Sequence, residues 1–217
     1  SMLDILNQGL SIALSNFLSR LAFAIIGGLL LGLSLAGYGM SFLAWFALLP
    51  LLLLIKSSFT LRGSIFDSIV FFLVFNLSSF IWLLALHPLT WQGLSNQESI
   101  LVSVLAWITP SITHTLILLP FCIAFKLLLI FRAKERSCEL NLLDIIALAF
   151  LWVVIEHKLA LGLGNNLRSF FVPINLLAYS QYQNLHFIQI ANLVGSIGVE
   201  FILIFTNLLL SNLFNVH

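Results

Sequence analysis

Long runs of apolar residues, separated by short polar or charged stretches, divide the chain into about six segments. A membrane-crossing helix needs about 20 mostly apolar residues, and no charged residue lies between Arg20 and Lys56. Gly37-Tyr38-Gly39 interrupts that stretch, which is long enough for two short spans. The pattern predicts an all-α integral membrane bundle of about six transmembrane helices, at approximately 21–36, 41–55, 68–86, 100–131, 142–163 and 187–213. Residues 1–217 then form a single membrane domain, with no soluble domain.

Two stretches leave the course of the chain open. Residues 3–19 form either an amphipathic helix on the membrane surface or an extension of the first span. Pro110 and Pro120 lie inside the fourth segment. We expect them to kink that helix rather than end it, because neighbouring helices can satisfy the carbonyls that proline leaves free.

Lysine and arginine residues lie in alternate loops, and this sets the predicted orientation. Arg20 precedes the first span, Lys56 and Arg62 follow the second, and a third group follows the fourth: Arg132, Lys134 and Arg136. Short loops rich in positive charge stay in the cytoplasm, so both termini are expected to be cytoplasmic. The outer face then carries the loop at 164–186, whose segment 171–184 (FVPINLLAYSQYQN) is polar and has no charge.

The composition confirms the membrane class and narrows the chemistry. Hydrophobic residues make up 61% of the chain and charged residues 8%, against roughly 25% charged residues in a soluble domain. The net charge of +1, spread over scattered cations, argues against a nucleic-acid partner. Cys122 lies in an apolar run and Cys138 in a charged loop, a spacing that fits no metal site. No cofactor motif, Walker loop or metalloprotease motif occurs, so no cofactor is expected.

Ionisable residues inside spans are costly and mark functional or structural sites. Glu156, His157 and Lys158 lie in the outer half of the fifth span. Two interpretations remain open. Lys158 reaches the interface while Glu156 pairs with it or with Arg168, or else Glu156 shapes a polar cavity for a lipid headgroup or substrate.

The last span and the fourth carry further polar residues. A stripe on one helical face of the last span consists of Asn192, Ser196, Glu200, Asn207 and Ser211. This stripe either holds helices together or lines a cavity. His114 in the fourth span is interpreted as a packing residue with satisfied hydrogen bonds, since no nucleophile can be assigned to it by local spacing.

Four segments, in this order, resemble the bacterial apolipoprotein N-acyltransferases. They are 35–51 (LAGYGMSFLAWFALLPL), 75–93 with Trp82 and Gly93, 151–156 (LWVVIE), and 173–181 (PINLLAYSQ) followed by 189–201 (QIANLVGSIGVEF). The sequence departs from the family pattern at Leu159, where the family has arginine, at Ile174, where it has tryptophan, and at Ala178, where it has glycine.

The resemblance implies a multi-pass protein of the bacterial cytoplasmic (inner) membrane that takes part in lipoprotein biosynthesis. In this family a phospholipid acyl chain is transferred to the N-terminal diacylglyceryl-cysteine of a lipoprotein, so phospholipid and the lipoprotein N-terminus are the implied partners. The resemblance places a substrate-facing rim on the outer face, formed by Trp82, His87, Glu156, Tyr179, Ser180 and Gln181. It makes 171–184 a re-entrant part of this rim.

The family carries its Glu-Lys-Cys catalytic trio on a nitrilase-like domain, and no part of this sequence resembles that domain. We therefore assign no catalytic residue and no metal ligand here, and expect a truncated chain that is inactive alone. A small membrane transporter or channel component, and a non-functional remnant, remain alternatives.

Overall fold

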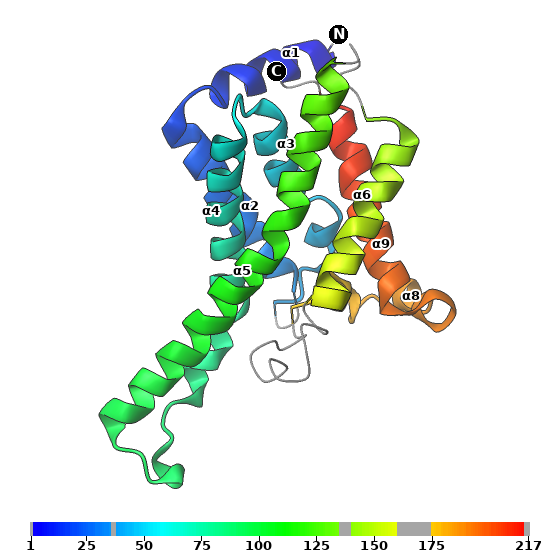
Figure 1. Ribbon diagram of the computed structural model, residues 1–217. Helices are drawn as coiled ribbons and strands as arrows, with labels where there is room; N and C mark the ends of the chain where they lie inside the picture. The colour runs from blue at the N-terminus through cyan, green and yellow to red at the C-terminus, as the bar shows by residue number, and fades with distance from the viewer. Residues whose placement is uncertain (1, 36–37, 135–139, 160–174, 215–217) are drawn as a thin grey trace.

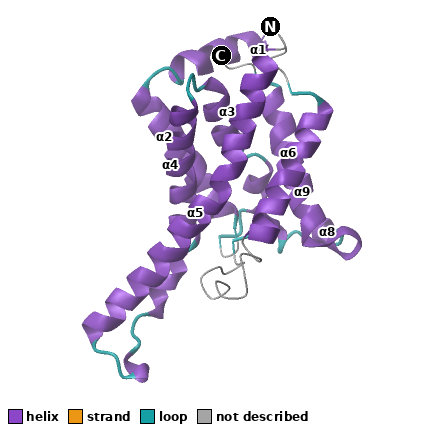
Figure 2. Ribbon diagram, in the orientation of Figure 1, coloured by secondary structure: helices purple, strands orange, loops and turns teal. Residues whose placement is uncertain are grey.

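The structure, a computed structural model, describes residues 2–35, 38–134, 140–159 and 175–214, which form helices and no strand (Figure 1). Figure 2 shows these helices joined by short connections. The α-helices are α1 (Met2–Ala13), α2 (Phe17–Ser34), α3 (Leu49–Ser57), α4 (Leu61–Ser79), α5 (Asn96–Lys134), α6 (Leu142–Val154), α8 (Leu185–Ile188) and α9 (Ala191–Asn212). The 3-10 helices are η1 (Ser41–Trp45), η2 (Ile81–Leu86), η3 (Thr90–Gln92) and η5 (Leu177–Gln181), and η4 (Ile155–Leu159) is a π-helix.

Four of these helical stretches are long and apolar enough to cross a membrane, as predicted for an integral membrane protein. They are Phe17–Ser34, Leu61–Leu86, Asn96–Lys134 and Ala191–Asn212. The predicted second and fifth spans correspond to shorter pieces, the η1–α3 stretch Ser41–Ser57 and the α6–η4 stretch. The count of six crossings therefore stays a prediction. α5 runs through Pro110 and Pro120 without ending, as the sequence indicated.

The two ends of the bundle differ in charge. Both termini lie at one end, where α1 lies across the bundle (Figure 1). Arg20, at this end, donates to the Leu54 carbonyl and pairs with Asp67, while Lys126 donates to the Ile55 carbonyl. We call this the basic end and the opposite one the far end. The predicted orientation makes the basic end cytoplasmic.

A turn separates α1 from the first long helix. Asn16 caps α2 by accepting a hydrogen bond from the Leu18 backbone N–H, and Arg20 also donates to the Leu14 carbonyl, which fixes the corner. α1 is thus a helix of its own rather than an extension of the first span.

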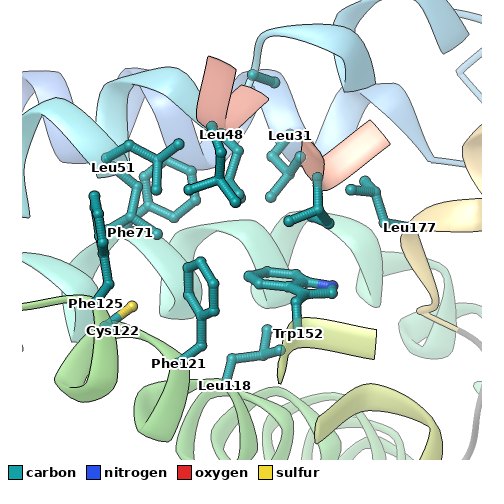
Figure 3. Packing of buried hydrophobic residues seen from close by; sticks show 14 of the residues in the cluster. Leu31, Leu48, Leu51, Phe71, Leu118, Phe121, Cys122, Phe125, Trp152 and Leu177 are labelled. Carbon is teal, nitrogen blue, oxygen red and sulfur yellow. The ribbon is translucent and has the colours of Figure 1, made fainter. Parts of the chain in front are cut away.

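Aromatic and aliphatic side chains from several helices fill the core of the bundle. The rings of Phe121 and Trp152 meet edge to face with centroids 5.0 Å apart, and Phe72 packs 6.0 Å from the same indole. Figure 3 shows Trp152 and Phe121 beside Cys122 and Leu48 in this cluster. Trp152 connects this core to the buried polar residues, because its ring nitrogen donates a hydrogen bond to Glu200.

Candidate functional site

Glu156 lies on the π-helix η4, which continues α6 at the far end. A π-helix inserts an extra residue per turn and is frequent at functional sites. The side chain of Glu156 is 1% exposed. Glu156 therefore lies inside the bundle and not against lipid.

Glu200 on α9 is held by two donors from the α6–η4 helix. The Trp152 indole Nε1–H donates to Glu200 Oε1 at 2.9 Å, and His157 Nε2 lies 2.8 Å from Glu200 Oε2. Both carboxyl oxygens of Glu200 are therefore paired, which joins two helices inside the bundle. Glu156 and Glu200 are close enough to interact electrostatically.

Glu156 is different from Glu200 because neither of its carboxyl oxygens has a hydrogen-bond partner among the described residues. Two ionisable side chains lie beside it: Glu200, and His114, whose Nε2 lies 3.9 Å from Glu156 Oε1, beyond hydrogen-bond reach. The predicted pairing of Glu156 with Lys158 or Arg168 depends on side chains outside the described part of the structure.

Asn76 on α4 links His114 to the loop segment. Its Nδ2 donates to Thr115 Oγ1 at 3.1 Å and to the Phe72 carbonyl at 2.8 Å. Its Oδ1 therefore accepts, from Asn175 Nδ2 at 2.8 Å and from His114 Nδ1 at the same distance. His114 Nδ1 is thus satisfied, and its other nitrogen faces Glu156.

These residues form one buried group, which we call the polar cluster: Asn76, His114, Trp152, Glu156, His157, Asn175 and Glu200. They come from α4, α5, α6, η4, α9 and the stretch before η5. Chain positions as far apart as 76 and 200 meet here. No combination of described histidine, cysteine and acidic residues could hold a metal ion.

The polar segment 175–184 is packed into the far end instead of lying loosely over it. Ser180 and Gln181 are buried, and Gln181 Nε2 donates to the Ser41 carbonyl of η1 at 2.9 Å. Tyr179 and Tyr182 are 40% and 46% exposed. The rest of the predicted loop, 164–174, lies outside the described residues.

The six predicted rim residues fall into two groups. Glu156 and the 179–181 segment belong to the far end of the bundle. Trp82 lies on η2, and His87, which follows it, bonds to Ser99 Oγ at 2.9 Å. Figure 1 shows this part of the chain, with the first turns of α5, extending away from the bundle. The structure therefore does not bring Trp82 and His87 to Glu156.

The predicted stripe on the last span also divides. Gly195 has φ 68° and ψ −177°, which interrupts α9 between Asn192 and Glu200. Asn192 is exposed, Ser196 half-buried, and Glu200 belongs to the polar cluster. Asn207 accepts from the Leu48 N–H at 3.1 Å and donates to the Ala44 carbonyl at 2.9 Å. Asn207 therefore joins α9 to the η1–α3 stretch, the helix-packing role that the sequence left open.

Sequence reasoning did not select Asn76, Asn175 or Trp152 as site residues. Asn76 stands alone among apolar residues of the third segment (FFLVFNLSSF). A single amide in such a run indicates a hydrogen bond to another helix, since lipid offers it no partner. What the sequence could not supply was the identity of its partners 38 and 99 residues away along the chain.

The fold and the polar cluster define a helical integral membrane protein with ionisable groups held inside its bundle. Residues 27–209 match the family model described as the apolipoprotein N-acyltransferase N-terminal domain, and the chain belongs to that family. The resemblance seen in the sequence is confirmed.

Curated relatives agree with this assignment. An apolipoprotein N-acyltransferase of Prochlorococcus marinus is 31% identical over 65% of this chain and 28% of the relative. One of Geobacter metallireducens is 29% identical over 86% of this chain and 32% of the relative. The chain thus spans about a third or less of the relatives' length. No solved structure gives a significant match.

Proposed function

We propose that the chain is the membrane domain of an apolipoprotein N-acyltransferase of the bacterial cytoplasmic membrane. The complete protein would transfer an acyl chain from a phospholipid to the N-terminal diacylglyceryl-cysteine of a lipoprotein. The membrane domain would receive the lipid substrates at its far end, facing outward. The family match over residues 27–209 supports this reading.

The observation that carries the proposal is the Glu156 carboxyl, which is buried without a hydrogen-bond partner among the described residues. Burying an unpaired ionisable group costs several kcal/mol. Groups of this kind inside membrane proteins are typical of functional sites. A residue that joins helices has its polar atoms paired, as Asn207 does.

The surroundings of Glu156 fit a site for the polar part of a lipid. Tyr179 and Tyr182 are exposed next to buried Ser180 and Gln181, and tyrosine is typical of headgroup depth. We therefore infer that the 175–184 segment and the polar cluster form the floor of the substrate site.

In this proposal the chain contributes no nucleophile. Cys122 is 1% exposed in the aromatic core, so a lipid carbonyl could not reach its thiol. Acyl transfer would depend on residues that correspond to the part of the relatives beyond the matched third. Residues 1–217 alone are expected to show no acyl transfer.

A chimera tests the proposed function. This chain would replace the matching segment of the Geobacter metallireducens relative, and acyl transfer from phospholipid to a diacylated lipopeptide would be followed by mass spectrometry. We expect a rate of transfer within about tenfold of the unmodified relative, because the exchanged domain supports the reaction without supplying its nucleophile. A tenfold loss corresponds to about 1.4 kcal/mol of transition-state stabilisation.

Protection of Cys122 from a thiol reagent reports whether the bundle in the chimera is folded. A folded chimera without transfer contradicts the proposal. If the chimera does not fold, residues 1–217 in nanodiscs are irradiated with a phospholipid that carries a photoactivatable headgroup. Labelling at Tyr179 or Tyr182 supports the proposal. Labelling that is no stronger there than at Phe59, an exposed residue of the basic end, contradicts it.

A further inference from the structure

Helix α5 is much longer than the helices around it. It has 39 residues, against 18 in α2 and 19 in α4. At a rise of about 1.5 Å per residue it is about 58 Å long, whereas the hydrocarbon layer of a bilayer is about 30 Å thick. Part of α5 must therefore extend beyond the level at which its neighbours end.

Two hydrogen bonds show which part this is. Lys126 Nζ donates to the Ile55 carbonyl at the basic end, and Trp107 Nε1 donates to the Leu77 carbonyl near the end of α4. The 20 residues from 107 to 126 cover about 28 Å along the helix axis. Residues 96–106 lie beyond, together with η2 and η3. We call residues 81–106 the arm; Figure 1 shows it projecting obliquely from the bundle.

Within the arm, hydrogen bonds of Ser99 hold α5 to the segment that follows η2. The Ser99 hydroxyl bonds to His87 Nδ1 at 2.9 Å and accepts from the Leu89 N–H at 2.7 Å. Ser103 Oγ donates to the Ser99 carbonyl one turn further on. Ser95 and Glu98 cap the start of α5, since Glu98 accepts from the Ser95 N–H and Ser95 Oγ accepts from the Glu98 N–H. The two sides of the arm are therefore tied together.

The outer surface of the arm is apolar along its body and polar at its tip. Its exposed apolar residues are Ile81, Trp82, Leu86, Ile100, Leu101, Val102 and Leu105. Its tip exposes Trp91 and a run of uncharged polar residues with one charge, Glu98. A surface of this kind would be unfavourable in water, because monomeric soluble proteins expose few contiguous apolar patches.

The apolar surface of the arm continues the surface that α5 presents to lipid. Leu101, Leu105, Ile112 and Leu116 are all exposed and follow one another at spacings of four, seven and four residues. These spacings place them on one side of the helix. The stripe thus passes from the middle of the bundle onto the arm, with exposed Thr109 as a polar position on the same side.

We propose that the apolar face of the arm is a lipid-binding surface, covered by phospholipid acyl chains of the far-end leaflet. An oblique arm stays within the leaflet over most of its length, and its polar tip reaches the headgroups. Trp82 and Trp91 then take the interfacial depth that tryptophan favours. This inference does not depend on the acyltransferase assignment, since it rests on the helix lengths and exposed residues of α5.

Collision measurements on spin labels test the arm directly. Leu101→Cys and Leu105→Cys would be labelled with a nitroxide in a Cys138→Ser background and placed in phosphatidylethanolamine–phosphatidylglycerol nanodiscs. Cys122 is buried and stays unlabelled. We expect both labels to collide with oxygen, which concentrates in hydrocarbon, as strongly as a label at Leu116. A label at Gln97 should collide with a water-soluble nickel complex instead.

Two results would overturn the inference. Access of the nickel complex to positions 101 and 105 would show that the arm stands in water. Protection from both reagents, as expected for a label at buried Ser103, would show that protein covers it. The labelled arm positions 97, 101 and 105 are exposed, so these substitutions remove no buried contact.

Discussion

Replacing Gly28 with leucine is expected to separate α2 from α4 and to destabilise the bundle strongly. A Cβ atom at Gly28 would lie 2.5 Å from the Phe71 carbonyl oxygen and 3.1 Å from Val74 Cβ. The first of these atoms belongs to the backbone, so no rotamer change can make room. Overpacking costs about 1–3 kcal/mol where side chains can adjust, and we expect about 3 kcal/mol or more here.

Buried Cys122 supplies the readout. In a Cys138→Ser background its reaction with a thiol-reactive dye on heating reports unfolding, because the native thiol is inaccessible. Gly28→Leu should strongly lower the temperature midpoint of this unfolding transition, or leave Cys122 reactive before heating begins. Gly9→Ala is the matched control, since nothing lies within 4 Å of a Cβ there and alanine favours the helix. Equal midpoints for Gly28→Leu and wild type would refute the close α2–α4 packing.

Replacing Glu200 with alanine is expected to cost about 3–5 kcal/mol of stability. The substitution leaves the Trp152 Nε1–H and His157 Nε2 without their partners and opens space between α6 and α9. The Cys122 assay measures the loss, and Glu98→Ala is the control. Glu98 is exposed and caps only the start of α5.

A double-mutant cycle distinguishes the network from a general loss of packing. If His157 bonds to Glu200, the effects of Glu200→Ala and His157→Ala should not add, because each removes the same interaction. Strict additivity would mean that the two side chains do not interact, contrary to the 2.8 Å contact.

The membrane class and the main apolar spans could be predicted because lipid imposes long apolar runs. The ends of the helices are harder to predict. α4 begins at Leu61, seven residues before the predicted start at 68, because Asp67 pairs with Arg20 and can enter the helix. The fifth helix changes to a π-helix at Ile155, and Gly195 interrupts the last one. Neither change has a periodic signal in the sequence.

The candidate site could be predicted only in part. Glu156 and Glu200 each stood out as carboxylates within apolar runs, but as separate features. Their meeting depends on α6 packing against α9, which no local pattern specifies. Conversely, Trp82 was grouped with Glu156 because both were expected at the same level. The arm removes Trp82 from the cluster, since the length of α5 beyond its neighbours depends on where they end.

The central claim is that the polar cluster serves lipid substrates and does more than hold helices together, and Glu156→Gln tests it most directly. Glu156 has no hydrogen-bond partner among the described residues. Glu156→Gln should therefore leave the free energy of unfolding, measured by the Cys122 assay, within about 1 kcal/mol of wild type. In the chimera the same change should lower acyl transfer at least about tenfold, equivalent to ~1.4 kcal/mol. A folded Glu156→Gln chimera with unchanged transfer, or a loss of transfer that only follows a loss of stability, would contradict the claim.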